Sequence, residues 1–126
     1  MARLRILYGE GEAEVLSAQA KAFEKAGHTV QKAVGRKDTE EALKKSTFDL
    51  LVLGATLTRN DRHHLPYMAK KADGKIGVLV MHADGTRHPY VDACTDTGSS
   101  METVLQRINA MKIAGRSSAT AAGAGR

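Results

Sequence analysis

The side chains that could bind a metal are histidines and one cysteine. A metal site would have to combine His63, His64, His82, His88 and Cys94. The neighbours His63 and His64 point in different directions, and no spacing typical of metal ligands repeats along the chain. The sequence therefore predicts no metal centre. We expect His82, at a strand end, to be a satisfied polar residue, although a histidine there could also sense pH.

Acidic residues suggest a second kind of site. Glu10 and Glu12 alternate with glycines at residues 9–12, a loop before a predicted helix. Such loops can bind phosphate, but two carboxylates oppose an anion, and the segment matches neither GxGxxG nor the P-loop. Asp49 lies at the start of a strand and Asp61 on a loop. No Ser-His-Asp or Cys-His set is recognisable by motif, so no catalytic residue is predicted.

The element that must position any reactive group is the segment FDLLVLG at residues 48–54. Its continuous apolar run suits a strand that is covered on both faces, the central strand of a parallel sheet. In open parallel sheets the chemistry lies just beyond the carboxyl ends of the strands. The residue at that position is Gly54, which has no side chain.

The rest of the chain alternates strands and helices. Asp38 and Ser99 each begin a pattern that resembles a capping box, and Pro66 suits the first turn of a helix that ends before Gly74. Strands are expected at residues 3–8, 28–33, 48–54, 76–81 and 90–95. Helices are expected at residues 12–26, 38–46, from 66 and from 99, with polar loops at 9–12 and 55–64.

The composition suits one compact domain of 126 residues, 42% of them hydrophobic. We expect a domain at residues 1–113 and a disordered tail at 114–126, which carries no large apolar residue. The alternation of elements predicts an α/β fold with a mainly parallel, five-stranded, flavodoxin-like sheet of order 2-1-3-4-5 between two helical layers.

The net charge of +5 does not by itself predict a nucleic-acid partner. The basic residues are scattered, often beside acids, without a basic run or interleaved aromatics. No stretch reaches about eighteen apolar residues, and the N-terminus lacks the features of a signal peptide. We expect a cytoplasmic protein with no membrane or nucleic-acid partner. The single cysteine, Cys94, agrees with a reducing compartment.

Five segments together carry a family resemblance. They are RILYGEGE, FEKAGHTV, DTEEALKKSTFDLLVLG, GVLVMHA and SSMETVLQRI. In order, spacing and hydrophobic pattern, residues 3–112 resemble the receiver domain of two-component response regulators. The resemblance implies cytoplasmic signalling by phosphorelay. Its chemistry needs an acidic pair that holds Mg²⁺, an acceptor aspartate, a Thr or Ser and a Lys, each after a different strand.

Almost none of the residues that this chemistry needs are present when the family's pattern is aligned with the chain. The acidic pair falls on Glu10 and Gly11, the acceptor on Gly54, the Thr or Ser on His82, and the Lys near Thr95 to Thr97, with Thr97 preferred. Without a nucleophile at position 54, aspartyl phosphorylation at the usual site is excluded. We expect no cofactor, and the Mg²⁺ site to be lost or weak.

The segment before the fifth strand also departs from the family. Only residues 82–91 separate the fourth and fifth apolar runs, and a parallel crossover usually needs a dozen residues or more. We expect the helix at this place to be shortened or lost, or the fifth strand to be displaced or absent. Because signalling receivers contact partners there, the partner surface is expected to be remodelled.

These observations leave two classes of function. The first is an atypical receiver that acts through contacts with a histidine kinase, another regulator or a second copy, without being an enzyme. The second is a flavodoxin-like domain that binds a small ligand or a metal. A pocket around Glu10, Gly54 and His82 would favour the second. A filled edge with an apolar patch elsewhere would favour the first.

Overall fold

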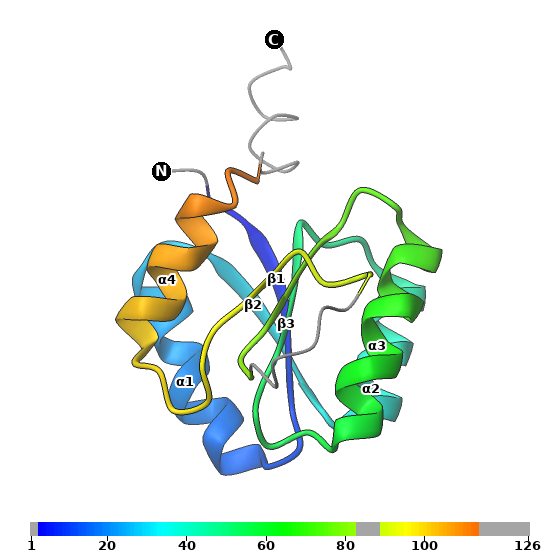
Figure 1. The fold of residues 1–126 in the computed structure, drawn as a ribbon, viewed down its shortest axis with the longest axis horizontal. Coiled ribbons are helices and arrows are strands. Elements are labelled where there is room, and N and C mark those ends of the chain that lie inside the picture. The colour runs from blue at the N-terminus through cyan, green and yellow to red at the C-terminus, as the bar shows by residue number, and fades with distance from the viewer. Residues whose placement is uncertain (1–2, 83–88, 114–126) are drawn as a thin grey trace, which may run out of the picture.

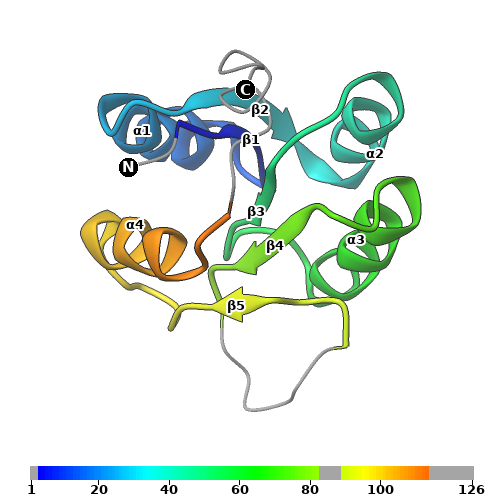
Figure 2. The same cartoon turned by 90° about the horizontal axis from the view of Figure 1, so that it is seen from above.

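The computed structural model describes residues 3–82 and 89–113. In this part of the chain one parallel sheet has the strand order β2-β1-β3-β4-β5, as predicted. Helices α1 and α4 cover one face of the sheet, and α2 and α3 cover the other (Figures 1 and 2). The strands are β1 (Arg5–Glu10), β2 (Thr29–Val34), β3 (Leu50–Leu53), β4 (Gly77–Val80) and β5 (Ala93–Cys94). The helices are α1 (Ala13–Lys25), α2 (Gly35–Lys45), α3 (Arg59–Ala72) and α4 (Met101–Ala110).

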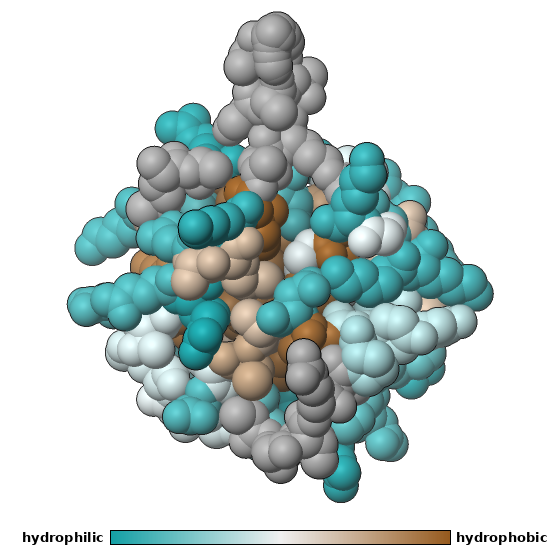
Figure 3. All heavy atoms as spheres, turned by 45° about the horizontal axis from the view of Figure 1, so that its top comes forward, coloured by the Kyte–Doolittle hydropathy of each residue, from teal (hydrophilic) through white to brown (hydrophobic). Residues whose placement is uncertain are grey.

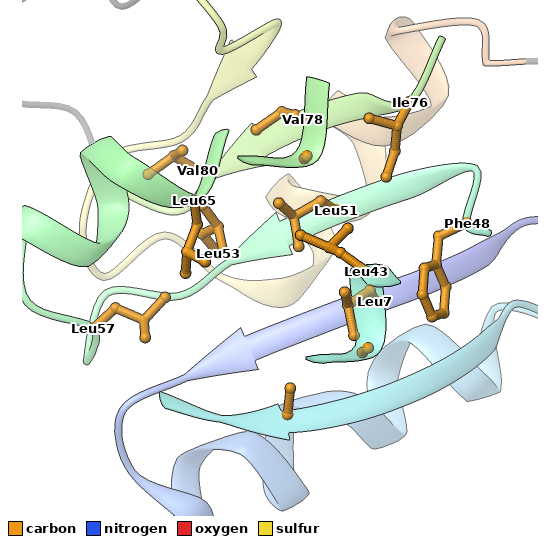
Figure 4. Packing of buried hydrophobic residues seen from close by; sticks show 13 residues of the cluster. Leu7, Leu43, Phe48, Leu51, Leu53, Leu57, Leu65, Ile76, Val78 and Val80 are labelled. Carbon is orange, nitrogen blue, oxygen red and sulfur yellow. The ribbon is translucent and has the colours of Figure 1, made fainter. Parts of the chain in front are cut away.

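The central position predicted for β3 is confirmed. This strand lies between β1 and β4, and all four of its residues are fully buried. Because side chains alternate along a strand, Leu51 and Leu53 pack toward α2 and α3, whereas Leu50 and Val52 pack toward α1 and α4. Burying a side chain of this size contributes about 1.5–3 kcal/mol, so both helical layers are held through this strand. Figure 4 shows the first of these two clusters.

The first strand is longer than predicted. Gly9 and Glu10 pair in register with Ala33 and Val34 of β2, so they belong to β1 and not to a loop. The glycine at position 9 was interpreted as a turn signal. In the structure it fits a close approach instead, because a Cβ there would lie 2.8 Å from Thr39 Oγ1.

Two helices begin earlier than predicted. Helix α2 begins at Gly35, and Asp38 lies within its first turn, where its carboxylate accepts a hydrogen bond from Val34 N at 3.4 Å. Helix α3 begins at Arg59 and contains Pro66 in its interior. The polar start of α3 was predicted as a loop, but Thr58 caps it by accepting a hydrogen bond from Asp61 N at 3.1 Å.

The last helix has the predicted apolar face but a different cap. Val104 and Ile108 are buried. The side chain of Ser100, not Ser99, accepts the capping hydrogen bond from Thr103 N at 3.2 Å. The capping residue was therefore predicted one position too early.

The connection from β4 to β5 returns parallel to β4. Val80 pairs with Cys94, so the fifth strand is present, although it is shorter than the predicted 90–95. The described residues of the connection, 81–82 and 89–92, are not helical. Residues 83–88, where the shortened helix was expected, lie outside the described part of the chain, as does the predicted tail at 114–126.

Within residues 3–82 and 89–113, no helix has both the length and the apolar character needed to cross a membrane.

Candidate functional site at the carboxyl edge

Three of the predicted positions meet where the strands end. Glu10 is the last residue of β1, Gly54 follows β3, and His82 lies two residues beyond β4. Gly54 N donates a hydrogen bond to Gly9 O at 2.8 Å, which fixes the ends of β1 and β3 side by side. Glu10 is only 1% exposed, so the one carboxylate retained at the acidic-pair position is inside the protein.

The Glu10 carboxylate is held by three donors. Its Oε1 accepts hydrogen bonds from Thr56 N at 3.1 Å and from Thr56 Oγ1 at 2.6 Å. Its Oε2 accepts a hydrogen bond from the Tyr8 hydroxyl. Burying a carboxylate costs free energy unless its oxygens accept hydrogen bonds, and these three donors supply such bonds without a cation.

Tyr8 links the carboxylate to α1. Its ring is fully buried and packs edge-on against Phe23, with ring centroids 5.2 Å apart. Burial, followed by the hydrogen bond to Glu10, raises the pKa of the phenol well above its usual range. The phenol oxygen also lies 2.5 Å from the side-chain amide of Gln19. One hydroxyl proton cannot serve two acceptors, so the arrangement is consistent when Gln19 presents its NH₂ group to Tyr8.

Glycine is required at two of the predicted site positions. A Cβ at Gly54 would lie 1.7 Å from Glu10 Cδ and 1.9 Å from both carboxylate oxygens. A Cβ at Gly11 would lie 2.2 Å from Thr56 O. The space into which an acceptor side chain would project is therefore occupied by the Glu10 carboxylate, and the second acidic-pair position faces backbone.

Hydrogen bonds hold the loop between β3 and α3 on both sides. Thr56 Oγ1 accepts hydrogen bonds from Gly11 N at 2.7 Å and Glu12 N at 3.1 Å, while it donates to Glu10. On the other side, the Arg62 guanidinium donates to Leu57 O at 2.5 Å. The loops that follow β1 and β3 are thus connected through one threonine side chain.

His82 and Thr97 also come together. His82 Nδ1 lies 2.5 Å from Thr97 Oγ1, a hydrogen bond whose direction depends on the tautomer of the histidine. The two residues predicted to take the places of the Thr or Ser and of the Lys therefore connect the end of β4 with the segment after β5.

The residues present do not fit a magnesium ion. Mg²⁺ is usually bound by carboxylates. Here Glu10 is already bonded to Tyr8 and Thr56, and Gly11 and Gly54 offer no side-chain ligand. In the described part of the chain, no three His, Cys, Asp or Glu side chains gather closely enough to hold a metal. Of the histidines considered for a metal site, His88 lies outside the described residues.

Two other acids, Asp49 and Asp61, were considered from the sequence. Asp49 precedes β3 and accepts a hydrogen bond from Arg5 N at 2.8 Å, at the amino edge of the sheet. Asp61 lies in the first turn of α3. Neither takes the place of an acceptor at the carboxyl edge.

Sequence reasoning did not find three residues of this edge, Tyr8, Gln19 and Thr56, and it named Thr95 only as one end of the range given for the Lys. Tyr8 was assigned to the apolar core, and its hydroxyl gave no local signal of a partner two residues away. Thr56 was part of a segment interpreted as a polar loop. Thr95 is 4% exposed, and its hydroxyl has no hydrogen-bond partner in the described part of the chain.

Comparisons with known proteins agree on the fold. No family model matches the chain, and no curated protein is similar in sequence. A CheY-like response regulator receiver domain from Methanospirillum hungatei JF-1 has a TM-score of 0.75 at 16% identity, covering 87% of this chain and 93% of that chain. A two-component response regulator from Clostridium difficile has a TM-score of 0.75 at 14% identity, covering 87% and 96%. The receiver domain of the hybrid histidine kinase CckA has a TM-score of 0.70 at 22% identity, covering 85% and 97%. The chain therefore has the fold of response regulator receiver domains.

Proposed function

We propose that this chain is a receiver-like module in signal transduction that acts through protein contacts and is not switched by aspartyl phosphorylation. The observation that carries the proposal is the Glu10 carboxylate, which fills the space above Gly54. Loss of an acceptor alone would leave an empty position. Here the position is occupied by a side chain of the same chemical type, buried and bonded to Tyr8 and Thr56.

Glu10 is a poor substitute for the missing nucleophile. A carboxylate that receives a phosphoryl group must be approached in line by the donor, with a cation to neutralise the transferred oxygens. Glu10 is 1% exposed, and both of its oxygens accept hydrogen bonds from the protein. Attack by Glu10 would require the Tyr8 and Thr56 bonds to break first, which argues against a relocated phosphorylation site.

The same hydrogen bonds favour one fixed arrangement of the edge. Thr56 connects the loops after β1 and β3, and the His82–Thr97 bond connects the end of β4 with the segment after β5. A phosphorylation switch needs two arrangements of such an edge that differ little in free energy. These hydrogen bonds join neighbouring segments of the edge without a ligand, and they support a module with a constant contact surface.

Apolar groups elsewhere support protein contact. Tyr67 of α3 and Tyr90 are 41% and 39% exposed, and their ring centroids lie 5.6 Å apart. Figure 3, which brings the amino edge of the sheet forward, shows apolar side chains in the centre of this face, between hydrophilic ones. A groove of about 620 Å³ is lined in part by Ile76, Met111 and Ile113. A histidine kinase, another regulator or a second copy of the chain are the partners we consider.

The test is whether a phosphodonor modifies the protein. The full chain is incubated with acetyl phosphate and MgCl₂, beside a receiver that carries an acceptor aspartate, and both are measured by intact mass. We expect a phosphoryl adduct on the control receiver and none on this chain. An adduct that peptide mapping locates at residues 9–12 or 54–61 would contradict the proposal.

A further inference from the structure

A groove lies at the amino edge of the sheet, at the far end of the strands from Glu10. It has a volume of about 620 Å³ and lies between the end of α3, the start of β4, the segment before β5 and the end of α4. Ligand pockets usually measure about 300–1,000 Å³, so large side chains of a partner can enter it. The described residues that line it are Lys70, Lys75, Ile76, Gly77, Asp92, Met111 and Ile113.

One wall of the groove is apolar. Met111 and Ile113 are half-buried and line it from the end of α4 (Figure 3 shows apolar side chains in the centre of this face). Ile113 lies directly over Gly77, since a Cβ at Gly77 would be 2.8 Å from Ile113 Cδ1. Lys112, between them in the chain, has a φ of 53°, a conformation that glycine usually adopts after a helix. The chain after α4 therefore folds back onto β4 and leaves two apolar side chains partly open to solvent.

The opposite wall is held by an ion pair. Lys70 Nζ donates hydrogen bonds to Asp92 Oδ2 at 2.8 Å and to Ile76 O at 2.5 Å. The same carboxylate oxygen accepts a hydrogen bond from Val78 N at 2.9 Å. These bonds join α3, β4 and the segment before β5. The charge of Asp92 is therefore balanced within the protein, and the wall keeps its shape without a partner.

Two lysines at the groove have no such counterion. Lys75 lines the groove and is exposed, and Lys112 is exposed between two residues that line it. Within residues 3–82 and 89–113, neither of these two ammonium groups forms an ion pair. An apolar wall beside uncompensated positive charge is complementary to a partner that is both apolar and acidic.

The rest of the amino edge has the same sign of charge. All four helices run back to this edge and carry basic residues in their last turns: Lys25, Lys44, Lys45, Lys70, Lys71 and Arg107. The acids in this region are Glu24, Asp49, Asp73 and Asp92, of which Asp49 is buried and Asp92 is bonded to Lys70. An acidic partner would therefore be attracted to this edge before it contacts the groove.

The charges also decide between possible occupants. A symmetric pair of chains joined through this groove would place the lysines of both copies against one another. Residues 114–126, which follow Ile113, include two arginines but no acid and no large apolar residue. Their composition complements neither the charge of the groove nor its apolar wall. A segment of another protein that carries large apolar side chains beside Asp or Glu complements both.

We propose that this groove binds an acidic, amphipathic segment of a partner protein. Its apolar side chains pack against Met111 and Ile113, and its carboxylates contact Lys75 and Lys112. The inference rests on the proposed function, because it gives the chemistry of the partner of a module that acts through contacts. Burial of apolar surface supplies affinity, and the lysines supply the preference for acidic partners.

The probe is a peptide, blocked at both ends, of about ten residues in which pairs of leucines alternate with pairs of glutamates. One comparison peptide has lysines in place of the glutamates, and another has serines in place of the leucines. Each is titrated into the ¹⁵N-labelled full chain at equal ionic strength. We expect the acidic leucine peptide to shift the amide signals of Gly77, Met111 and Ile113 in a saturable manner, with a Kd of about 0.1–1 mM. The two comparison peptides should not.

Two pairs of variants assign the binding to named groups. Lys75→Glu should weaken the binding of the acidic leucine peptide about tenfold, because it reverses a charge at the groove. Lys37→Glu, in the first turn of α2, changes the net charge by the same amount and should bind as the unmodified chain does. Met111→Gln should weaken binding by a similar factor, whereas Tyr67→Gln, at the exposed aromatic pair, should not. Thermal unfolding shows that each variant is folded.

Lys112→Gly separates binding from folding. Glycine adopts a φ of 53° without the steric cost that a lysine side chain brings, so the Tm of this variant should rise. Its affinity for the acidic leucine peptide should nevertheless fall, because an ammonium group is lost. A higher Tm with unchanged affinity would contradict the contact proposed for Lys112.

Three results would overturn the proposal as a whole. The first is the absence of saturable shifts at roughly 2 mM acidic leucine peptide. The second is an equal loss of affinity in Lys75→Glu and Lys37→Glu, which would show that the peptide responds to net charge alone. The third is a shift of the same amide signals when the concentration of the chain is raised without peptide, which would show that a second copy occupies the groove.

The phosphodonor experiment keeps the two proposals apart. If the peptide does not bind and no phosphoryl adduct forms, the groove is excluded as the contact site while the proposed function stands. A phosphoryl adduct at the carboxyl edge would contradict the proposed function itself, whatever the peptide does.

Discussion

At the scale of single residues, one carboxylate and one glycine define the carboxyl edge of the sheet. The Cβ that any other residue would bring to position 54 meets Glu10 Cδ at 1.7 Å. The end of a glutamate side chain is often free to move, but this one is buried and bonded on both oxygens. Gly54 and Glu10 therefore form a matched pair, in which each residue constrains the other.

The first prediction concerns Gly54→Ala. We expect it to lower the free energy of unfolding by about 1–3 kcal/mol, because the methyl group forces the Glu10 side chain out of its hydrogen bonds. Gly74→Ala is the matched control, since among the residues that the structure describes its Cβ would meet Lys70 O alone, at 4.0 Å. Urea unfolding curves of both variants give the comparison. Equal stability of the two would contradict the packing described for position 54.

A double-mutant cycle extends this test. In a Glu10→Ala background the Cβ at position 54 meets no carboxylate. Gly54→Ala should then lower the free energy of unfolding by less than it does in the unmodified chain. We expect a coupling energy of about 1 kcal/mol or more between the two positions, as for residues in direct contact. Additive costs from the same urea measurements would show that Glu10 does not occupy this space.

His28 predicts a pH dependence of stability. Its Nδ1 accepts a hydrogen bond from Leu4 N at 3.1 Å, and burial lowers its pKa in the folded state. The unfolded chain, with a pKa of about 6.5, then binds the proton more readily. His28 therefore contributes to the free energy of unfolding above about pH 6.5, and this contribution is lost as the pH falls below that value.

The check is thermal unfolding between pH 5 and pH 7.5. A His28→Gln variant should show a smaller loss of Tm at the acidic end than the unmodified chain. His64→Gln, at a half-buried position on α3, should keep the full loss. A His28 variant with an unchanged pH profile would rule out this histidine as the titrating group.

At the scale of elements, the strands were predictable, whereas the starts of α2 and α3 were not. The run at Leu50–Leu53 reads as a buried strand from its composition alone, because both of its faces are covered. The start of α3 cannot be recognised in this way, because Thr58 and the charged residues after it have the composition of a polar loop. The helix forms there because it buries Leu65 and Ala69. Pro66 was interpreted by its usual preference, which tertiary packing overrides.

The caps of α4 give a direct test at this scale. The sequence pattern indicated Ser99, whereas the structure has Ser100 accepting from Thr103 N. We expect Ser100→Ala to destabilise the protein by about 1 kcal/mol, the usual cost of losing an N-cap. Ser99→Ala should cost less. If chemical denaturation gives the opposite ranking, the helix begins where the sequence pattern indicated.

At the scale of the whole molecule, the sheet order and the layers followed from the alternation of elements, and the site followed only in part. The sequence identified Glu10, Gly54, His82 and Thr97 as the positions to examine. It could not predict that Glu10 turns toward Gly54, or that Tyr8 and Thr56 hold it there. The contacts of Glu10 with Gly54 and Thr56 join residues that are far apart in sequence, and no local pattern encodes them.

The chain has the fold of receiver domains, and at its carboxyl edge the space above Gly54 is filled by the Glu10 side chain. Removal of an acceptor would by itself leave space for a metal and a phosphoryl group. The buried carboxylate, the two close-packed glycines and the hydrogen bonds of Thr56 close that space. The remaining open volume lies to one side, against α1 and Thr95.

The most direct measurement is a ¹H–¹⁵N NMR titration of the full chain with MgCl₂, followed by addition of acetyl phosphate. The account predicts that the amide signals of Glu10, Gly54 and Thr56 keep their positions throughout, because the Glu10 carboxylate already has its partners. Saturable shifts of these three signals with Mg²⁺, followed by a second set of signals with acetyl phosphate, would contradict it.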